Sequence, residues 1–204
     1  MDRVADPSID PGEIEAFRAL QARLRPLYER IFPDPSLPRT VLILPSLSLD
    51  ADVLARISAV PAYEERMLCL LLLLRMPATR AVYVTSAPVA DATVDYYLHL
   101  LEGIPHRHAR ERLTLFSCHD NSSEPLSSKI LRRPRLLKRI REALGDPALA
   151  HMACFNVTPL ERRLALELGI PIYGCDPELL PFGSKSGARK LFREAGVAMP
   201  DGFE

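Results

Sequence analysis

A lysine placed just before a short amphipathic helix is the first feature of this sequence that could do chemistry. The run Gly183-Ser184-Lys185-Ser186 precedes apolar residues spaced three and four positions apart between Ala188 and Ala195. This pattern predicts a helix capped by one of the two serines. Because a helix N-terminus attracts phosphate, an ammonium group beside it would add to the attraction. Lys185 is therefore a candidate phosphate ligand, and the alternative is an ordinary solvated lysine.

The two common nucleotide-binding fingerprints are absent. In a P-loop the second glycine directly precedes the lysine, whereas here a serine separates Gly183 from Lys185, and Glu178 stands where the first glycine should be. No G-x-G-x-x-G follows an apolar run that could be a strand, so the sequence shows no dinucleotide-binding turn.

Apolar runs that alternate with helical patterns predict the scaffold. The expected strands are 40–44, 80–85, 112–116, 149–155 and 170–173. Nearly continuous apolar strands separated by helices are typical of a parallel sheet with both faces covered. We therefore expect an α/β fold with a Rossmann-like parallel sheet of about five strands. An N-terminal helix from Pro11 to Ile31 precedes it, with a kink or break at Pro26.

Small polar residues follow most of these strands. Right-handed crossovers place every strand-to-helix loop at one edge of a parallel sheet, which is where such folds bind small molecules. The predicted crevice residues are Ser86, His119, Asp120, Asn156, Thr158 and Asp176. For Asn156 and Thr158 there is a purely structural alternative, since either can cap the next helix and Glu161 can complete a capping box with Thr158.

Other candidate chemistry is weaker. Cys118 and His119 could form a nucleophile and its base, but adjacent residues on an extended loop point in different directions. No cluster of ligands suggests a metal site. The basic segment from Arg132 to Arg141 has an apolar face and no interleaved aromatic residues, so we interpret it as a solvated helix face rather than an RNA site.

Composition excludes several classes of partner. The 204-residue chain has a formal net charge of zero, so no overall field favours nucleic acid or an anionic membrane. The longest apolar run, Met67 to Leu74, is far shorter than the ~20 residues of a membrane span and is expected to be a buried helix. Residues 1–6 lack a signal-peptide core, and the four cysteines show no C-x-x-C spacing. These features predict a cytoplasmic protein with reduced thiols.

Two groups of segments resemble known ligases. Ser184-Lys185 and the ending Ala195-Gly196-Val197-Ala198-Met199-Pro200 resemble the opening of the ATP-grasp module, with a serine in place of the usual aspartate before the lysine. Upstream, Ser117-Cys118-His119-Asp120 and the segments 154–162 and 168–177 resemble the pre-ATP-grasp domain of actinobacterial peptide ligases related to the pheganomycin enzyme. The resemblance covers about Arg80 to Glu204.

The resemblance implies an ATP-dependent carboxylate–amine ligase that acts through an acylphosphate, with Lys185 on an ATP phosphate and Mg²⁺ bridging the phosphates. Its substrates would be a small-molecule carboxylate and an amine, as an amino acid or peptide. The expected parts are an N-terminal helical segment (1–38), the pre-ATP-grasp domain (39–180) and the first ATP-grasp helix (181–204).

Because Glu204 comes just where the ATP-grasp module begins, we expect a fragment that packs against later C-terminal ATP-grasp lobes. Such a fragment would contain no catalytic or metal-binding residue and would be inactive alone. The alternative is a non-catalytic, stand-alone α/β module that binds small molecules.

Overall fold

The computed structural model describes residues 11–49, 51–57 and 60–202, without the side chains of residues 51 and 52. Two compact units make up the chain, Met1–Gly174 and Cys175–Glu204, and each is described by itself. Two expectations concern residues outside this description: the absence of a signal peptide at residues 1–6 and the end of the chain at residues 203–204.

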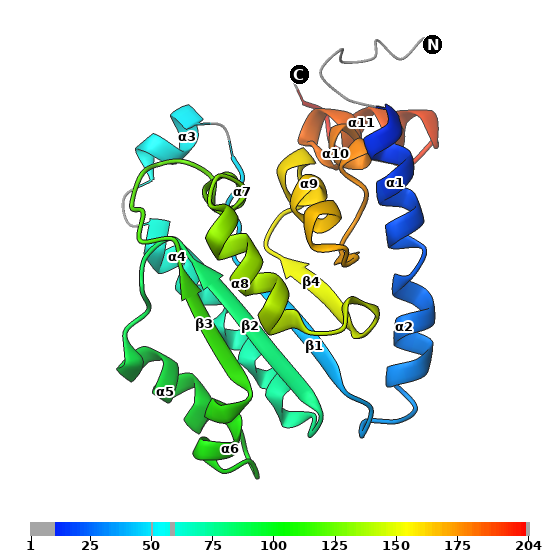
Figure 1. The fold of residues 1–204 in the computed structure, drawn as a ribbon. Helices are drawn as coiled ribbons and strands as arrows, with labels where there is room; N and C mark the ends of the chain where they lie inside the picture. The colour runs from blue at the N-terminus through cyan, green and yellow to red at the C-terminus, as the bar shows by residue number, and fades with distance from the viewer. Residues whose placement is uncertain (1–10, 50, 58–59, 203–204) are drawn as a thin grey trace. The chain divides into compact units, whose positions relative to one another are not determined.

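The first unit is an α/β fold with five parallel strands in the order β3-β2-β1-β4-β5 (Figure 1). Its helices and strands, with η for 3-10 helices, are α1 (Pro11–Gln21), α2 (Leu24–Ile31), β1 (Arg39–Leu44), α3 (Ala51–Arg56), α4 (Val60–Arg66), η1 (Met67–Arg75), β2 (Thr79–Thr85), α5 (Asp91–His99), α6 (His106–Glu111), β3 (Leu113–Ser117), α7 (Leu126–Leu131), α8 (Pro134–Leu144), η2 (Pro147–Leu149), β4 (Ala150–Cys154), α9 (Pro159–Leu168) and β5 (Ile172–Tyr173). The predicted α/β class and the five-stranded parallel sheet are confirmed.

Helices cover the two faces of the sheet, and each face has its own core. On one face Leu42 and Val82 pack with apolar residues of α1, α7, α8 and α9, and Figure 1 shows α8 crossing in front of the strands. On the other face Val41 and Tyr83 pack with η1, α5 and α6. The continuous apolar strands of the sequence reflect this burial on both sides.

The order of the strands fixes where a crevice can form. The chain runs outward from β1 to β2 and β3 with helices on one face, then returns to β4 and β5 with helices on the other. β1 and β4 are neighbours whose following loops leave toward opposite faces. This is a topological switch point, and open α/β sheets bind ligands at such points beyond the carboxyl ends of their strands.

The structure corrects one local expectation and adds detail at two further segments. The N-terminal helix breaks between Gln21 and Leu24 rather than at Pro26, which lies in the first turn of α2, where a missing N–H costs no helical hydrogen bond. Met67–Arg75 is a 3-10 helix, and with three residues per turn it buries Leu68, Leu71 and Leu74. The segment His106-Arg107-His108, whose sequence shows no helical apolar period, lies in the short helix α6.

A glutamine side chain covers the edge strand β5. The Gln21 amide oxygen accepts from the Ile172 N–H at 2.6 Å, and its amide nitrogen donates to the Ile172 carbonyl at 3.0 Å. The same nitrogen lies 3.4 Å from the Gly174 carbonyl oxygen. Gln21 thus satisfies backbone groups that an open edge would leave for another strand.

The second unit contains η3 (Pro177–Leu179), α10 (Leu180–Gly183) and α11 (Lys185–Glu194). Ser184 caps α11 by accepting from the Gly187 N–H at 2.9 Å. A Cβ at Gly187 would lie 1.8 Å from the Pro181 carbonyl oxygen, so only glycine fits there. At the other end Gly196 has φ 65, and the Val197 and Gly196 N–H groups donate to Phe192 and Arg193 carbonyls, which is a Schellman ending.

Within the described part of the chain, no helix has both the length and the hydropathy that crossing a bilayer requires.

Candidate functional site

The loops that follow β1 and β4 are joined at the switch point by Asn156. Its side-chain oxygen accepts from the Ser48 N–H and its side-chain nitrogen donates to the Ser48 carbonyl, both at 3.0 Å. The buried Ser46 hydroxyl donates to the Asn156 carbonyl at 3.2 Å. An amide that binds both backbone groups of one residue holds these two loops in a fixed arrangement.

A fully buried carboxylate, Glu161, organises the next layer. One of its oxygens accepts from the Ser48 and Ser127 hydroxyls at 2.5 Å each, and the other accepts from the Thr158 N–H at 2.8 Å and hydroxyl at 2.6 Å. Thr158 in turn caps α9, which completes the capping box. Four donors satisfy the buried charge, and they tie α7 and α9 to the loop after β1.

A second buried network lies beyond β2. The Glu64 carboxylate accepts from the Ser86 N–H and hydroxyl, both at 2.6 Å. The fully buried Lys129 ammonium donates to the Ser86 hydroxyl at 3.0 Å and to the carbonyls of Asp120 and Ser122 at 2.9 and 2.8 Å. Burial raises the pKa of Glu64, against the opposing effects of Ser86 and Lys129.

Asp120 belongs to the same network. Its N–H donates to the Ser86 carbonyl at 2.9 Å, and its carboxylate accepts from Arg133 at 2.7 Å and from the Ser122 N–H at 3.0 Å. Hydrogen bonds from Ser122 and then Arg133 hold the pKa of Asp120 well below its usual range. Asp120 is therefore a fixed anion and has little capacity to act as a base near neutral pH.

The Cys118–His119 pair lacks the features of a nucleophile and its base. Burial raises the pKa of the Cys118 thiol to about 11, which disfavours the thiolate. His119 has φ 50, an uncommon value for a residue other than glycine, and its N–H donates to the Ser117 hydroxyl at 3.0 Å.

The remaining candidates lie in the second unit. Asp176 caps η3 by accepting from the Glu178 N–H at 3.0 Å. Lys185 begins α11 and its side chain is exposed. Ser86 and Asp120 therefore share one network of the first unit, and Asn156 and Thr158 share another, while Lys185 and Asp176 belong to the second unit.

The described residues contain no group of three or more histidine, cysteine, aspartate or glutamate side chains that could hold a metal ion.

Sequence reasoning overlooked the ionised groups that organise this edge. The sequence analysis did not single out Glu64 or Lys129, although Lys129 follows Leu126 and Ser127 and precedes Ile130, on the buried side of α7. A lysine among buried helix positions was the available signal, because an ammonium is buried only when it has partners.

Comparison with known proteins gives a partial match. The chain is 34% identical over 142 residues to the L-propargylglycine–L-glutamate ligase of Streptantibioticus cattleyicolor, covering 68% of this chain and 30% of that protein. This chain is similar to part of a ligase. It is also 26% identical over 183 residues to the IQ motif-containing protein H of Danio rerio, which covers 82% of this chain and 17% of that protein.

The chain therefore spans less than a third of the length of either relative. No protein-family profile matches it. No solved structure matches it at a significant level.

Proposed function

We propose that this chain is the pre-ATP-grasp part, with the first ATP-grasp helix, of an ATP-dependent carboxylate–amine ligase. In this reaction ATP phosphorylates the carboxylate, the amine attacks the acylphosphate, and ADP and phosphate leave. The observation behind the proposal is the 34% identity with a protein named as a ligase of two amino acids. By that name, the substrates proposed here are amino acids or short peptides.

The arrangement of the first unit suits a supporting role in such an enzyme. At the carboxyl edge, Asn156, Glu161 and Lys129 each have their polar atoms engaged by neighbouring protein groups. These residues build a rigid wall for a crevice, because a substrate would have to break existing hydrogen bonds to reach them. The groups that perform the phosphoryl transfer are proposed to lie in sequence that follows Glu204.

Lys185 is the residue of this chain proposed to bind ATP. Its ammonium is exposed at the start of the ten-residue helix α11, where the helix dipole favours an anion. A compact ammonium at that position is chemically suited to a phosphate oxygen. When bound, ATP supplies the phosphoryl group that activates the carboxylate. No residue of this chain is assigned a role toward Mg²⁺.

The test begins with the encoding DNA, read past the codon for Glu204. The longest product is then assayed for phosphate release with L-glutamate and each of the other amino acids, and hydroxylamine is added to trap an acylphosphate as a hydroxamate. We expect ATP turnover only when carboxylate and amine are both present. We also expect hydroxamate when hydroxylamine replaces the amine.

The matched variants are Lys185→Ala and Lys190→Ala, both at exposed positions of α11. Loss of a charge-assisted contact worth ~1.5 kcal/mol should raise the KM for ATP about tenfold in Lys185→Ala only. Equal effects of the two variants would refute the role of Lys185. A reading frame that ends at Glu204, with no nucleotide binding by the chain, would refute the ligase proposal itself.

A second candidate is a non-catalytic α/β module that binds a small molecule, because open α/β sheets bind ligands at a switch point such as that between β1 and β4. The zebrafish relative, whose name states an IQ motif and no reaction, fits this candidate as well. This second candidate predicts that the isolated chain binds a small molecule and that no longer product of the gene turns over ATP.

A further inference from the structure

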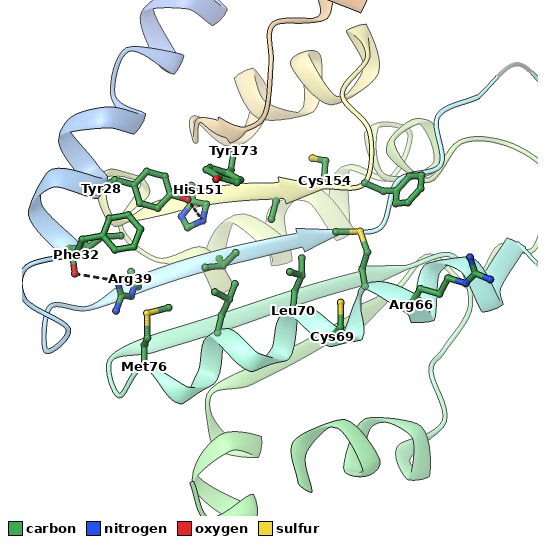
Figure 2. Close-up of a pocket in the computed structure, with 16 residues that line it drawn as sticks. Tyr28, Phe32, Arg39, Arg66, Cys69, Leu70, Met76, His151, Cys154 and Tyr173 are labelled. Carbon is green, nitrogen blue, oxygen red and sulfur yellow. Dashed lines mark hydrogen bonds between the residues drawn. The ribbon is translucent and has the colours of Figure 1, made fainter. Parts of the chain in front are cut away.

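A pocket of about 650 Å³ lies against one face of the sheet in the first unit, and its lining residues are not members of the polar networks described above. We call it the face pocket. Its floor is formed by β1, β4 and β5 through Val41, Ala153 and Tyr173. Its walls are α2 on one side and η1 on the other, and Figure 2 shows the two helices flanking the strands.

The topology of the sheet explains why this pocket exists. The crossovers that lead to β2 and β3 place η1, α5 and α6 on this face, over β1 to β3. The crossovers that lead to β4 and β5 use the opposite face, where α7, α8 and α9 pack. No crossover helix therefore covers this side of β4 and β5 in the described residues, and Tyr173 of β5 is 64% exposed.

Two buried polar side chains stand at the α2 end of this apolar pocket, as Figure 2 shows. Arg39 is only 3% exposed, yet no carboxylate pairs with it among the described residues. Its Nε donates to the Thr79 hydroxyl at 2.8 Å and its Nη1 to the Ile31 carbonyl at 3.3 Å. Its Nη2 has no hydrogen-bond partner in the described structure.

His151 is 5% exposed and has one free ring nitrogen. Its Nε2 lies 3.1 Å from the Tyr28 hydroxyl, while its Nδ1 has no partner among the described residues. Burial and the nearby Arg39 charge lower the pKa of His151 to about 4, so the ring is neutral near pH 7. In the tautomer where Tyr28 donates to Nε2, Nδ1 bears the hydrogen and is a second free donor beside Arg39.

A buried guanidinium without a counter-charge is costly, because the desolvation of an unpaired ion takes several kcal/mol. The unpaired Arg39 Nη2 and, in that tautomer, the His151 Nδ1–H stand at one end of an otherwise apolar cavity, an arrangement complementary to an anion with an apolar body. Arginine donates two parallel hydrogen bonds most effectively to a planar carboxylate. A volume of about 650 Å³ is within the range of pockets that hold small organic ligands.

We propose that the face pocket binds a small carboxylate with an apolar body, with the carboxylate at Arg39 and His151. In this arrangement the apolar body of the ligand lies along Val41, Leu70 and Leu73. It extends toward the end of the pocket where Figure 2 labels Cys154 and Arg66.

Arg39 Nη2 and His151 Nδ1 are shielded from solvent in this structure. The carboxylate reaches Arg39 when the guanidinium turns toward the cavity, a movement that breaks its hydrogen bonds to the Thr79 hydroxyl and the Ile31 carbonyl.

Octanoate and octan-1-ol are suitable probes, because they share an alkyl chain and differ in charge. Isothermal titration of the 204-residue chain should show octanoate binding at least tenfold more tightly than octan-1-ol. In Arg39→Met this preference should disappear while octan-1-ol binding is unchanged. Arg75→Met, an exposed position of η1 that does not line the pocket, should keep the preference.

A second variant covers the case in which Arg39→Met fails to fold. Ala153→Phe leaves Arg39 and His151 in place but fills the floor, so both probes should lose at least tenfold in affinity, with folding checked by circular dichroism. Equal wild-type affinities for the two probes, or octanoate binding that survives in Ala153→Phe, would overturn the proposal. Loss of the preference in Arg66→Met but not in Arg39→Met would overturn the position of the carboxylate. None of these outcomes depends on the ligase proposal.

Discussion

The histidine of the face pocket should make the protein sensitive to mild acid. His151 is buried, and its surroundings combine burial with the positive charge of Arg39. Both effects disfavour the imidazolium, and they lower the pKa from 6.5 to about 4. In the unfolded chain the ring returns to its ordinary pKa, so the unfolded state takes up a proton more readily than the folded state between these two values.

The sign follows from proton linkage. Between pH 6.5 and 4 the unfolded state binds more protons at this position, so the free energy of unfolding falls as the pH falls. The contribution is present above pH 6.5 and is lost by about pH 4. At 1.36 kcal/mol for each pH unit, the full effect is about 3 kcal/mol. Most of it, about 2 kcal/mol, should be lost between pH 7 and pH 4.5.

The assay is urea denaturation of the wild-type chain and of His151→Gln, each at pH 7 and pH 4.5. Glutamine cannot titrate but can still hydrogen bond to the Tyr28 hydroxyl. Other groups titrate alike in both proteins, so the difference between their acid losses isolates His151. Wild type should lose about 2 kcal/mol more than the variant.

The control is His108→Gln, at an exposed position of α6, which should follow wild type at both pH values. An equal acid loss in wild type and His151→Gln would refute the argument, because the ring would then have a similar pKa in the folded and unfolded states. A smaller loss in His108→Gln would show that a different histidine is responsible.

Two further substitutions test the buried polar contacts of the first unit. Gln21→Leu removes the side chain that covers β5 and leaves the Ile172 N–H without its acceptor. The free energy of unfolding, measured by urea denaturation, should therefore fall by about 2 kcal/mol. An effect below 0.5 kcal/mol would contradict the role of this amide. Lys129→Met leaves Glu64 as a buried charge without a cation and should cost about 3–5 kcal/mol, part of which Glu64→Gln should restore in the double variant. Lys138→Met, at an exposed position of α8, should change stability by less than 0.5 kcal/mol.

The sequence predicted those parts of the fold that depend on local signals. Continuous apolar runs located the strands, because burial on both faces demands such runs. The caps of α9 and the glycine ends at Gly169 and Gly196 were readable because each depends on a few adjacent residues. The break in the N-terminal helix was misplaced because a proline interrupts a helix only beyond its first turn. Helix α6 was missed because it buries only Ala109 and so shows no apolar period.

The polar groups were harder to interpret because their partners are distant in sequence. Asn156 could be recognised as a residue of the switch point, but its contact with Ser48 joins residues 108 positions apart. Arg39 directly precedes one apolar strand pattern and His151 interrupts another, so neither residue was singled out from the sequence. A charged residue at the start of a buried strand and a histidine within another were signals that could have been used.

The two regions of the first unit differ in a way that bears on where a ligand binds. At the carboxyl edge, Glu161 and Lys129 are buried, but each has at least three hydrogen-bond partners. A ligand there would compete with contacts already made. In the face pocket, Arg39 and His151 line the cavity, and each retains a nitrogen without a hydrogen-bond partner among the described residues. An unsatisfied buried donor gains more free energy from a new acceptor than a donor that already has one. Of these two regions of the chain, the face pocket therefore offers a small anion the larger gain in binding free energy.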